Sequence, residues 1–337
     1  MHRVTLVDTD ICFQQDETHD TLLRAGLSQG IGLPYECNSG GCGSCKFELL
    51  EGELEELWPD APALTARDRK KGRKLACQCR ALSDLVIRMR TDESCVPVHA
   101  PARQQAVLEA RRDITPDIVE FRLRTESPAH FQPGQYAMLT LPGTSAPRAY
   151  SMSNLANDNG IWEFWIRRKP DGAISPALFD SFHPGDTLAL DGPYGLAVLN
   201  TGSPRDVVCI AGGSGISPVL SIARGLLRSP ELADRALHFF LGARTRADIC
   251  GLDELAALPG FDTRVTTYIA LSDASPDEGW EGATGFIHEL VAKELGPRLA
   301  EHECYLAGPP PMVQATTRML MLDHKVPQEQ VHFDRFF

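Results

Sequence analysis

Alternating apolar and polar positions divide the first part of the chain into short predicted strands. Residues 4–7, 46–50 and 85–89 have the period of β-strands. Residues 21–29 instead have the spacing of an amphipathic helix. This mixture predicts a small domain built from short strands and one helix.

A second strand-rich region follows a linker. Residues 96–104 contain two prolines and have linker composition. Residues 106–141 alternate again, with interruptions by Thr-Pro at 115–116 and Pro-Gly at 133–134. Several short strands separated by turn residues predict a small antiparallel barrel.

The pattern changes at about residue 206. A continuous apolar strand is followed by a glycine turn, an amphipathic helix and another strand at residues 237–241, which together predict a βαβ unit. Ser217 is the expected N-cap of the helix, and Pro218 its first residue.

The same arrangement recurs near the end of the sequence. A strand at residues 304–307 is followed by Gly308 and Pro309, and then by a predicted helix at residues 312–322. Two glycine turns after parallel strands indicate one crevice at the carboxyl ends of the sheet.

Composition narrows the class of protein. The chain has 337 residues, a net charge of −12, and 43% hydrophobic and 23% charged residues. The acidic balance argues against a nucleic-acid partner. The apolar runs are shorter than the ~20 residues that a membrane-spanning helix needs. The opening segment carries acids where a signal peptide needs an apolar stretch, and ten cysteines suit a reducing compartment, so we expect a cytoplasmic protein.

Four cysteines carry the strongest chemical signal. Cys37, Cys42 and Cys45 stand in CNSGGCGSC and Cys77 follows at a distance, which is the spacing of a plant-type [2Fe-2S] ferredoxin. Glycines at positions 40, 41 and 43 are expected to allow positive φ and to aim backbone N–H groups at the sulfurs. A zinc site usually has C-x2-C pairs in both halves, and no second pair of that spacing occurs.

Phosphate recognition is the prediction for the glycine turn AGGSGISP. Gly212, Gly213 and Gly215 would bring backbone N–H groups and a helix N-terminus to a phosphate, although glycines for close packing alone are the structural alternative. The next strand ends in LGART, without an acid for a ribose 2′-hydroxyl. Arg244 and Arg246 could receive a 2′-phosphate, so NADH and NADPH both remain open here.

The barrel region has its own candidate phosphate site. Arg148, Tyr150 and Ser151 place a guanidinium, an aromatic ring and a hydroxyl at one strand end. Residues 172–175 form a turn into a short helix whose N-terminus could hold a pyrophosphate. Residues 192–195 (GPYG) are interpreted as a plain turn that closes the barrel.

Taken in order, these motifs resemble those of the ferredoxin-NADP reductase superfamily. The matching segments are RAYS, DGAIS, DGPYG, AGGSGISP, LGART and AGPPPM. CNSGGCGSC and LACQC make the chain similar to reductase components of bacterial oxygenases. The similarity extends over the whole chain and is greatest to the reductases of soluble diiron toluene and alkene monooxygenases, of the toluene 4-monooxygenase kind, through PYECNSGGCGSCK, LWPDAP, LACQC, LDGPYGL and KVPQEQVHFDRFF.

The resemblance implies a multidomain α+β and α/β fold. Residues 1–97 would form a β-grasp [2Fe-2S] ferredoxin domain, residues 103–200 an antiparallel β-barrel that binds FAD, and residues 201–337 a doubly wound parallel sheet that binds NAD(P)H. The implied cofactors are a [2Fe-2S] cluster, FAD and NADH.

It also implies a set of site residues. Cluster ligands fall on Cys37, Cys42, Cys45 and Cys77, and Cys79 is left as a non-ligand. The catalytic positions are Ser151 and Phe336, with Phe336 or Phe337 as the terminal aromatic that covers the flavin. Other FAD contacts fall on Arg148, Ala149, Tyr150, Ile166, Arg167, Gly172, Ala173, Ile174 and Ser175. Nicotinamide-nucleotide contacts fall on Gly212, Gly213, Gly215, Ile216, Gly242, Arg244, Gly308 and Pro309. Many relatives have Cys where this chain has Ala307, so a catalytic thiol is in doubt.

These parts together predict a converter of two-electron to one-electron transfer. Nicotinamide delivers a hydride, whereas a [2Fe-2S] cluster accepts one electron, and a flavin connects the two. The expected acceptor is a diiron hydroxylase or an intermediary ferredoxin. The rivals are a reductase for a Rieske-type dioxygenase and, more remotely, a redox sensor without turnover.

Overall fold

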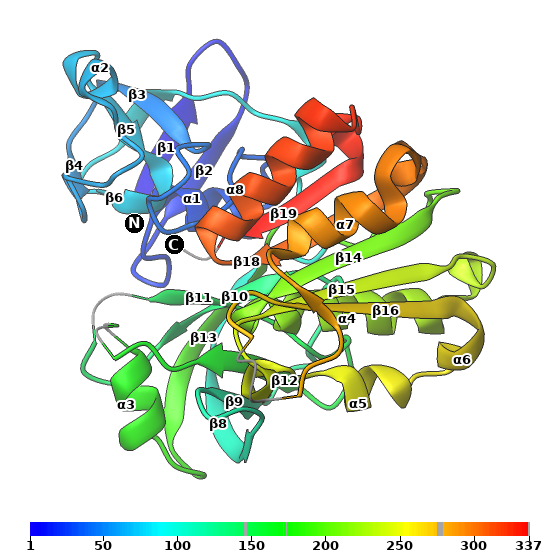
Figure 1. The fold of residues 1–337 in the computed structure, drawn as a ribbon. Helices are drawn as coiled ribbons and strands as arrows, with labels where there is room; N and C mark the ends of the chain where they lie inside the picture. Colours follow the sequence, from blue (N-terminus) through cyan, green and yellow to red (C-terminus); the bar gives the residue numbers. More distant parts are fainter. Residues whose placement is uncertain (145–146, 171, 173, 275–278, 336–337) are drawn as a thin grey trace.

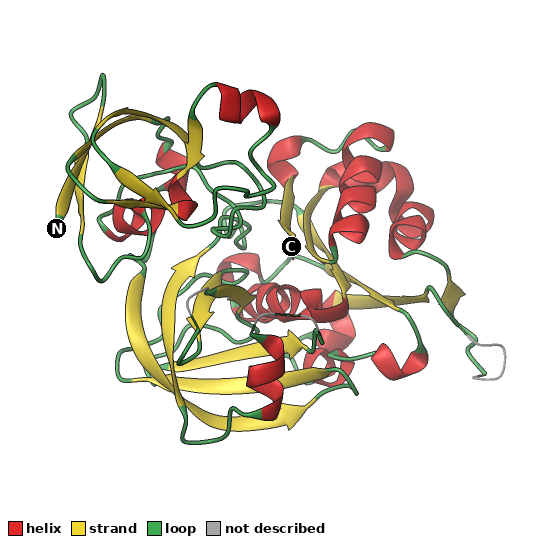
Figure 2. Ribbon diagram, turned by 90° about the vertical axis from the view of Figure 1, so that its left-hand side faces the viewer, coloured by secondary structure: helices red, strands yellow, loops and turns green. Residues whose placement is uncertain are grey.

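The computed structural model describes residues 1–144, 147–170, 172, 174–274 and 279–335, which form three units around three main sheets (Figure 1). The N-terminal unit and the barrel lie one above the other, and the parallel sheet lies beside both (Figure 2). The predicted fold class is confirmed.

The N-terminal unit has a five-stranded sheet in the order β2-β1-β7-β3-β5 and a two-stranded sheet of β4 and β6. Thr21 caps the helix α1 by accepting a hydrogen bond from the backbone N–H of Arg24. The elements are β1 (His2–Leu6), β2 (Cys12–Gln15), α1 (Leu22–Ser28), β3 (Lys46–Glu51), β4 (Leu54–Glu56), α2 (Ala66–Lys70), β5 (Arg73–Leu75), η1 (Ala76–Gln78), β6 (Cys79–Ala81), β7 (Leu85–Arg88) and η2 (Glu93–Cys95).

The second unit is an antiparallel sheet in the order β11-β10-β13-β8-β9-β12. A bridge between Met152, just after β11, and Phe164 on β12 closes it into a barrel. Its elements are β8 (Ala102–Asp113), β9 (Ile118–Thr125), β10 (Tyr136–Thr140), β11 (Arg148–Ser151), β12 (Ile161–Arg167), α3 (Ser175–Asp180) and β13 (Thr187–Tyr194). The expected turn at residues 192–194 is wrong, because these residues are the last three of β13. The strand ends at Tyr194, whose side chain is fully buried.

The third unit is a parallel sheet in the order β17-β16-β15-β14-β18-β19. Its strands are β14 (Asp206–Gly212), β15 (Leu237–Ala243), β16 (Val265–Leu271), β17 (Ala283–Thr284), β18 (His302–Gly308) and β19 (Val331–Arg335). Its helices are η3 (Gly213–Gly215), α4 (Ile216–Arg228), η4 (Pro230–Leu232), η5 (Arg246–Asp248), α5 (Leu252–Ala256), α6 (Phe261–Arg264), α7 (Ile287–Leu295), η7 (Gly296–Glu301), α8 (Pro310–Arg318), the π-turn η8 (Met319–Asp323) and η9 (Gln328–Gln330).

Helices cover both faces of this sheet, with α4 on one side and α7 and α8 on the other (Figure 1). The strand order reverses between β14 and β18, and ligands of such sheets bind at the carboxyl ends beside that reversal. The predicted crevice between the two glycine turns is therefore present in the topology.

The start of α4 differs from the expectation. The helix begins at Ile216 with Gly215 as its N-cap, so Ser217 and Pro218 lie within its first turn. The 3-10 turn of Gly213–Gly215 is continuous with the helix, so the helix begins earlier in the sequence than expected. Proline is still accommodated, because the first-turn N–H groups have no intrahelical acceptor. Among the described helices, none combines the length and apolar character that crossing a membrane requires.

Candidate functional site

The cysteine loop brings its thiols together as two pairs. Cys37 Sγ lies 3.3 Å from Cys42 Sγ, and Cys45 is hydrogen-bonded to Cys77, which η1 carries. The hydrogen bond from Cys42 lowers the pKa of Cys37, and that from Cys45 lowers the pKa of Cys77. Within the described ranges, no three His, Cys, Asp or Glu side chains converge as a single metal ion would require. Two pairs are what a two-iron centre requires.

Backbone donors surround the sulfurs as predicted. The N–H groups of Gly41 and Cys42 both lie 3.3 Å from Cys37 Sγ, and that of Ser44 lies 3.5 Å from Cys42 Sγ. Gly40 and Gly43 have φ of 85° and 83°, where a side chain would be strained. The expected positive φ at Gly41 is not found, because this glycine serves as a donor in an ordinary backbone conformation.

The predicted flavin residues gather at one end of the barrel. On β11, Arg148 and Ala149 are exposed, Tyr150 is half-buried and Ser151 is buried. Burial raises the pKa of Tyr150 to about 12, so its hydroxyl stays protonated. On the neighbouring β12, Ile166 is buried and Arg167 is half-buried.

The short helix α3 begins near the barrel end. Ile174 is its N-cap and Ser175 its first residue, and the Ser175 hydroxyl accepts a hydrogen bond from the backbone N–H of Lys169 at 2.7 Å. Gly172 precedes the turn. Ala173, Phe336 and Phe337 lie outside the described residues. The hydroxyl of Ser175 thus connects the start of α3 to the segment that follows β12.

Ser151 connects the barrel to the parallel sheet. Its hydroxyl donates to the carboxylate of Asp334 on β19 at 2.9 Å, and its carbonyl accepts a hydrogen bond from Ser217 on α4 at 2.7 Å. Arg224 of α4 donates to the carbonyl of Ser153 at 2.6 Å. Ser217, Ser221 and Arg224 of α4 thus all donate to barrel carbonyls, and these bonds hold the end of β11 against the carboxyl edge of the sheet.

The two glycine turns touch each other. A Cβ at Gly215 would lie 2.0 Å from the carbonyl oxygen of Ala307, and one at Gly308 would lie 2.9 Å from the carbonyl oxygen of Gly212. Close packing, the structural alternative to phosphate recognition, therefore explains the glycine at position 215. Gly213, with φ of 55°, faces Arg167, whose Nη1 would lie 2.9 Å from a Cβ there. Ile216 is buried, and Pro309 is exposed at the mouth of the second turn.

Two arginines meet two aspartates beside these turns. Arg167 donates to Asp117 at 2.6 Å and to Asp248 at 3.5 Å. Arg244 donates to the same two carboxylates, at 3.4 Å and 3.1 Å. Gly242, two residues before Arg244, packs close to Ile287. The carboxylates neutralise both guanidinium groups, so Arg244 is a weaker phosphate ligand than the sequence suggested.

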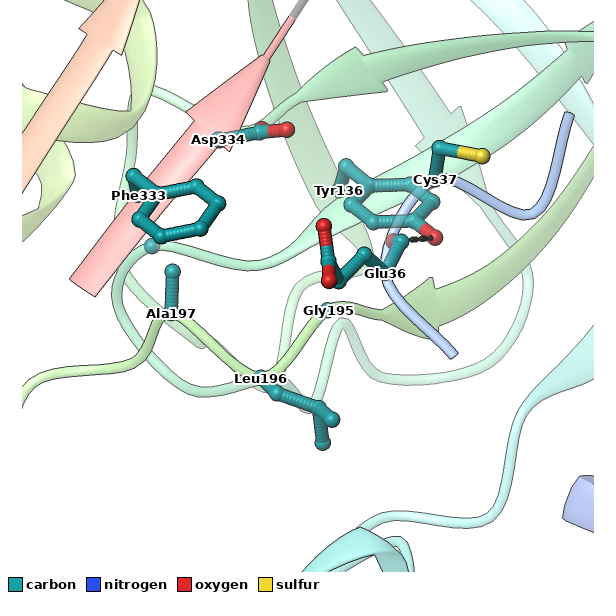
Figure 3. Close-up of a pocket in the computed structure, with 9 residues that line it drawn as sticks. Glu36, Cys37, Tyr136, Gly195, Leu196, Ala197, Phe333 and Asp334 are labelled. Carbon is teal, nitrogen blue, oxygen red and sulfur yellow. Dashed lines mark hydrogen bonds between the residues drawn. The ribbon is translucent and has the colours of Figure 1, made fainter. Parts of the chain in front are cut away.

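One pocket joins all three units (Figure 3). It holds about 440 Å³ of empty space, part of it open to solvent. Its lining comes from the cysteine loop, the barrel and β19: Glu36, Cys37, Gly134, Tyr136, Gly195, Leu196, Ala197, Phe333 and Asp334. Burial raises the pKa of Asp334 to about 6, although the bond from Ser151 opposes this shift.

Sequence reasoning missed the aromatic contact beside this pocket. Tyr136 Oη donates to the carbonyl of Glu36 at 2.8 Å, and the backbone N–H of Gly195 donates to Tyr35 Oη at 2.9 Å. The ring of Tyr194 lies 6.0 Å from that of Tyr136 and 6.3 Å from that of Tyr35. The only available signals were the tyrosines in PYEC and DGPYG, and neither motif reveals the other's position.

The stretch of residues 48–60, close to the cysteine loop, is rich in acidic residues. Most of these acids form ion pairs within the N-terminal unit: Glu48 with Arg73 and Arg88, Glu55 with Arg80, Glu56 with Lys74 and Asp60 with Arg69. The stretch is therefore largely neutralised. Trp58, which is 45% exposed, lies against Gly40 of the cysteine loop.

Three family models match the chain. The model of the 2Fe-2S iron-sulfur cluster binding domain matches residues 4–82. The oxidoreductase FAD-binding domain matches residues 105–198, and the oxidoreductase NAD-binding domain matches residues 209–318.

Curated relatives match over nearly the full length. The ferredoxin–NAD(P)(+) reductase CarAd of Metapseudomonas resinovorans is 46% identical and covers 94% of both chains. The ferredoxin–NAD(+) reductase component of the alkene monooxygenase system of Xanthobacter autotrophicus is 41% identical over 94% of this chain and 95% of its own. A solved structure of the ferredoxin reductase in carbazole 1,9a-dioxygenase superposes with a TM-score of 0.90 at 40% identity, covering 100% of this chain and 98% of that one.

Proposed function

The chain belongs to the ferredoxin-NADP reductase superfamily, among the oxygenase reductase components with [2Fe-2S], FAD and NAD domains, and we propose that its acceptor is a separate ferredoxin. It is an oxidoreductase that carries electrons from NADH through FAD to the cluster. The observation that supports this electron path is the pocket where the cysteine loop, the barrel and β19 meet, because its lining comes from all three units.

The residues present fit the iron–sulfur cluster. Cys37 and Cys42 would hold one iron, and Cys45 and Cys77 the other, since these are the pairs that the fold brings together. The N–H groups of residues 41, 42 and 44 point at the sulfurs and would stabilise their negative charge.

The barrel and the sheet fit the other two groups. Arg148, Tyr150 and the turn before α3 would hold FAD, and the glycine turns after β14 and β18 would hold the dinucleotide. Bound FAD would accept a hydride and release its electrons singly. Ser151 and Asp334 lie where β11, α4 and β19 converge, so we assign them to orienting the reacting groups.

The acceptor is assigned from the relatives. CarAd and the alkene monooxygenase component are both named ferredoxin reductases. The half-exposed residues 41–44 of the cysteine loop, together with the exposed Trp58, offer this ferredoxin a surface next to the cluster.

The second part of the proposal is the class of oxygenase that finally receives the electrons. We favour a diiron hydroxylase of a hydrocarbon monooxygenase, which the alkene, phenol and xylene monooxygenase relatives support. A ring dioxygenase is the second candidate, because the carbazole dioxygenase reductase matches the whole chain. We further place the protein in the cytoplasm, where the six cysteines outside the predicted cluster would remain reduced.

The acceptor can be tested with purified components. NADH oxidation by the holoprotein is followed with a diiron hydroxylase alone, and then with the hydroxylase plus a [2Fe-2S] ferredoxin from the same system. We expect turnover only when the ferredoxin is present. Equal rates of hydroxylase reduction with and without ferredoxin would contradict the proposed acceptor while leaving the reductase activity intact.

A further inference from the structure

The segment that leads into the first cysteine ligand is bonded to the barrel at two consecutive residues. Tyr35 accepts a hydrogen bond from the backbone N–H of Gly195. The carbonyl of Glu36 accepts one from Tyr136 Oη, as Figure 3 shows. Cys37 follows directly. Residues 35 and 36, with Tyr136 and Gly195, are called the loop contact below.

The barrel side of the loop contact is buried and belongs to paired strands. Tyr136 is 3% exposed and lies opposite Tyr194 on β13 and Ser151 on β11 in the strand register. The same strand pairing therefore connects Tyr136 to the Ser151 region of the predicted flavin site. Burial raises the pKa of Tyr136 well above its ordinary value, so its hydroxyl remains a hydrogen-bond donor.

Two cross-unit ion pairs lie elsewhere on the same interface. Asp20 pairs with Arg103 at 2.7 Å, and Arg24 lies 3.7 Å from Asp191. Arg24 of α1 also donates to the Asn38 side chain of the cysteine loop at 3.4 Å, so this pair reaches the loop through a side chain. The loop contact differs, because it bonds the barrel directly to the two residues that precede Cys37.

We propose that the loop contact fixes the distance between the cluster and the flavin, with Tyr136 as the positioning residue for electron transfer between them. The transfer moves one electron from the reduced flavin to the oxidised cluster and moves no atom. Residues 41–44 remain half-exposed in this docked arrangement. One arrangement of the units therefore serves both internal transfer and delivery to the acceptor. This inference rests on the proposed function.

Tyr136→Phe tests the inference, because it removes the hydroxyl and keeps the ring. Two properties of the holoprotein are measured. One is the rate at which NADH-reduced flavin reduces the cluster in a single anaerobic turnover, and the other is the hydrogen–deuterium exchange of the peptide containing residues 35–37. Losing one buried hydrogen bond corresponds to a factor of about five. We expect cluster reduction to slow about fivefold or more and exchange to rise about fivefold, with flavin reduction by NADH unchanged.

Tyr305→Phe is the matched control. Tyr305 is a buried tyrosine of β18, and its hydroxyl accepts a hydrogen bond from the backbone N–H of Asn200 at 2.8 Å, outside the N-terminal unit. It should leave cluster reduction and exchange at residues 35–37 unchanged. Equal effects of the two variants, or no effect of Tyr136→Phe, would overturn the inference.

A second variant keeps the inference testable if the Tyr136→Phe protein does not fold correctly. If Tyr136→Phe fails to assemble the cluster, Tyr35→Phe removes the other bond of the loop contact and should give the same slowing. Normal cluster reduction in Tyr35→Phe would then overturn the inference. Failure of the proposed function is distinguishable, because the unmodified protein would itself not reduce its cluster with NADH.

Discussion

Ser151 on β11 donates a hydrogen bond to Asp334 on β19, and the two oxygens lie 2.9 Å apart. This bond joins residues 183 positions apart and lies where the barrel, α4 and the last strand converge. Asp334 also lines the pocket that contains Glu36 and Cys37. A single carboxylate is thus in contact with the predicted flavin strand and close to the cysteine loop.

Asp334 predicts a pH dependence of stability. Its pKa is raised by burial from 3.8 to about 6, so between these values the folded protein holds a proton that the unfolded chain has lost. Stability should therefore fall as pH rises from about 4 to about 6, by about 2 kcal/mol after allowance for partial exposure. Asp334→Asn cannot titrate. The difference in thermal midpoint between the two proteins should grow across this window in favour of the variant.

Ser151→Ala is the companion to that experiment. The bond from Ser151 lowers the pKa of Asp334, so its removal should extend the sensitive window above pH 6. Parallel pH profiles for wild type and Asp334→Asn would show that this carboxylate does not titrate as described.

Gly215 predicts a steric effect at the nucleotide turn. A Cβ there would lie 2.0 Å from the carbonyl oxygen of Ala307, which is backbone and cannot rotate away. Gly215→Ala should cost about 1–3 kcal/mol or more and weaken NADH binding, because the turn must move. Gly202→Ala is the control, since the nearest atom to its Cβ lies 3.6 Å away. Similar thermal midpoints for the two variants would contradict the packing argument.

The two aspartates beside Arg244 predict a preference for NADH. Asp117 and Asp248 neutralise its guanidinium and would repel a 2′-phosphate. The double variant Asp117→Asn, Asp248→Asn should raise kcat/KM for NADPH relative to NADH about fivefold, since exposed charges contribute about 0.2–1 kcal/mol each. Arg244→Ala should leave NADH use nearly unchanged. An unaltered ratio of kcat/KM for NADPH to that for NADH in the double variant would show that the ribose binds away from these two aspartates.

Trp58 predicts where the acceptor docks. It is 45% exposed and contacts Gly40 in the cysteine loop, whereas the nearby acids are mostly ion-paired. Trp58→Ala should raise the apparent KM for the ferredoxin several-fold while NADH-to-dye activity persists, since aromatic side chains commonly dominate interface energies. Leu82→Ala, which removes another exposed apolar side chain of the same unit, should be silent. Equal effects of the two would argue against this surface.

Local patterns in the sequence predicted much of the fold. The cysteine spacing, the barrel strands and the glycine turns all depend on neighbouring residues, and their predicted elements are present in the structure. The predicted linker of residues 96–104 is shorter, because β8 already begins at Ala102. Thr21, for example, caps α1 within one position of the expected helix start. The start of α4 was misplaced because the 3-10 turn at Gly213 is continuous with the helix.

Contacts between units were beyond sequence reasoning. Tyr136 meets Glu36 across 100 positions, and Asp334 meets Ser151 across 183. No periodicity or spacing encodes such a pairing, because it depends on how three separately folded units dock. The same reason explains Tyr194, which resembled a turn residue in DGPYG but lies buried among aromatic rings at the interface.

The central claim is that electrons pass from NADH through the flavin to the cluster and only then leave the protein. Cys77→Ser removes one predicted ligand, and the holoproteins are compared by anaerobic NADH titration with EPR detection of the reduced cluster. Cys79→Ser is the control for a buried cysteine outside the ligand set. We predict that Cys77→Ser retains FAD, its reduction by NADH and dye reduction, but loses the cluster signal and ferredoxin reduction, whereas Cys79→Ser retains all four. Ferredoxin reduction at the wild-type rate in a Cys77→Ser protein without cluster would contradict the account.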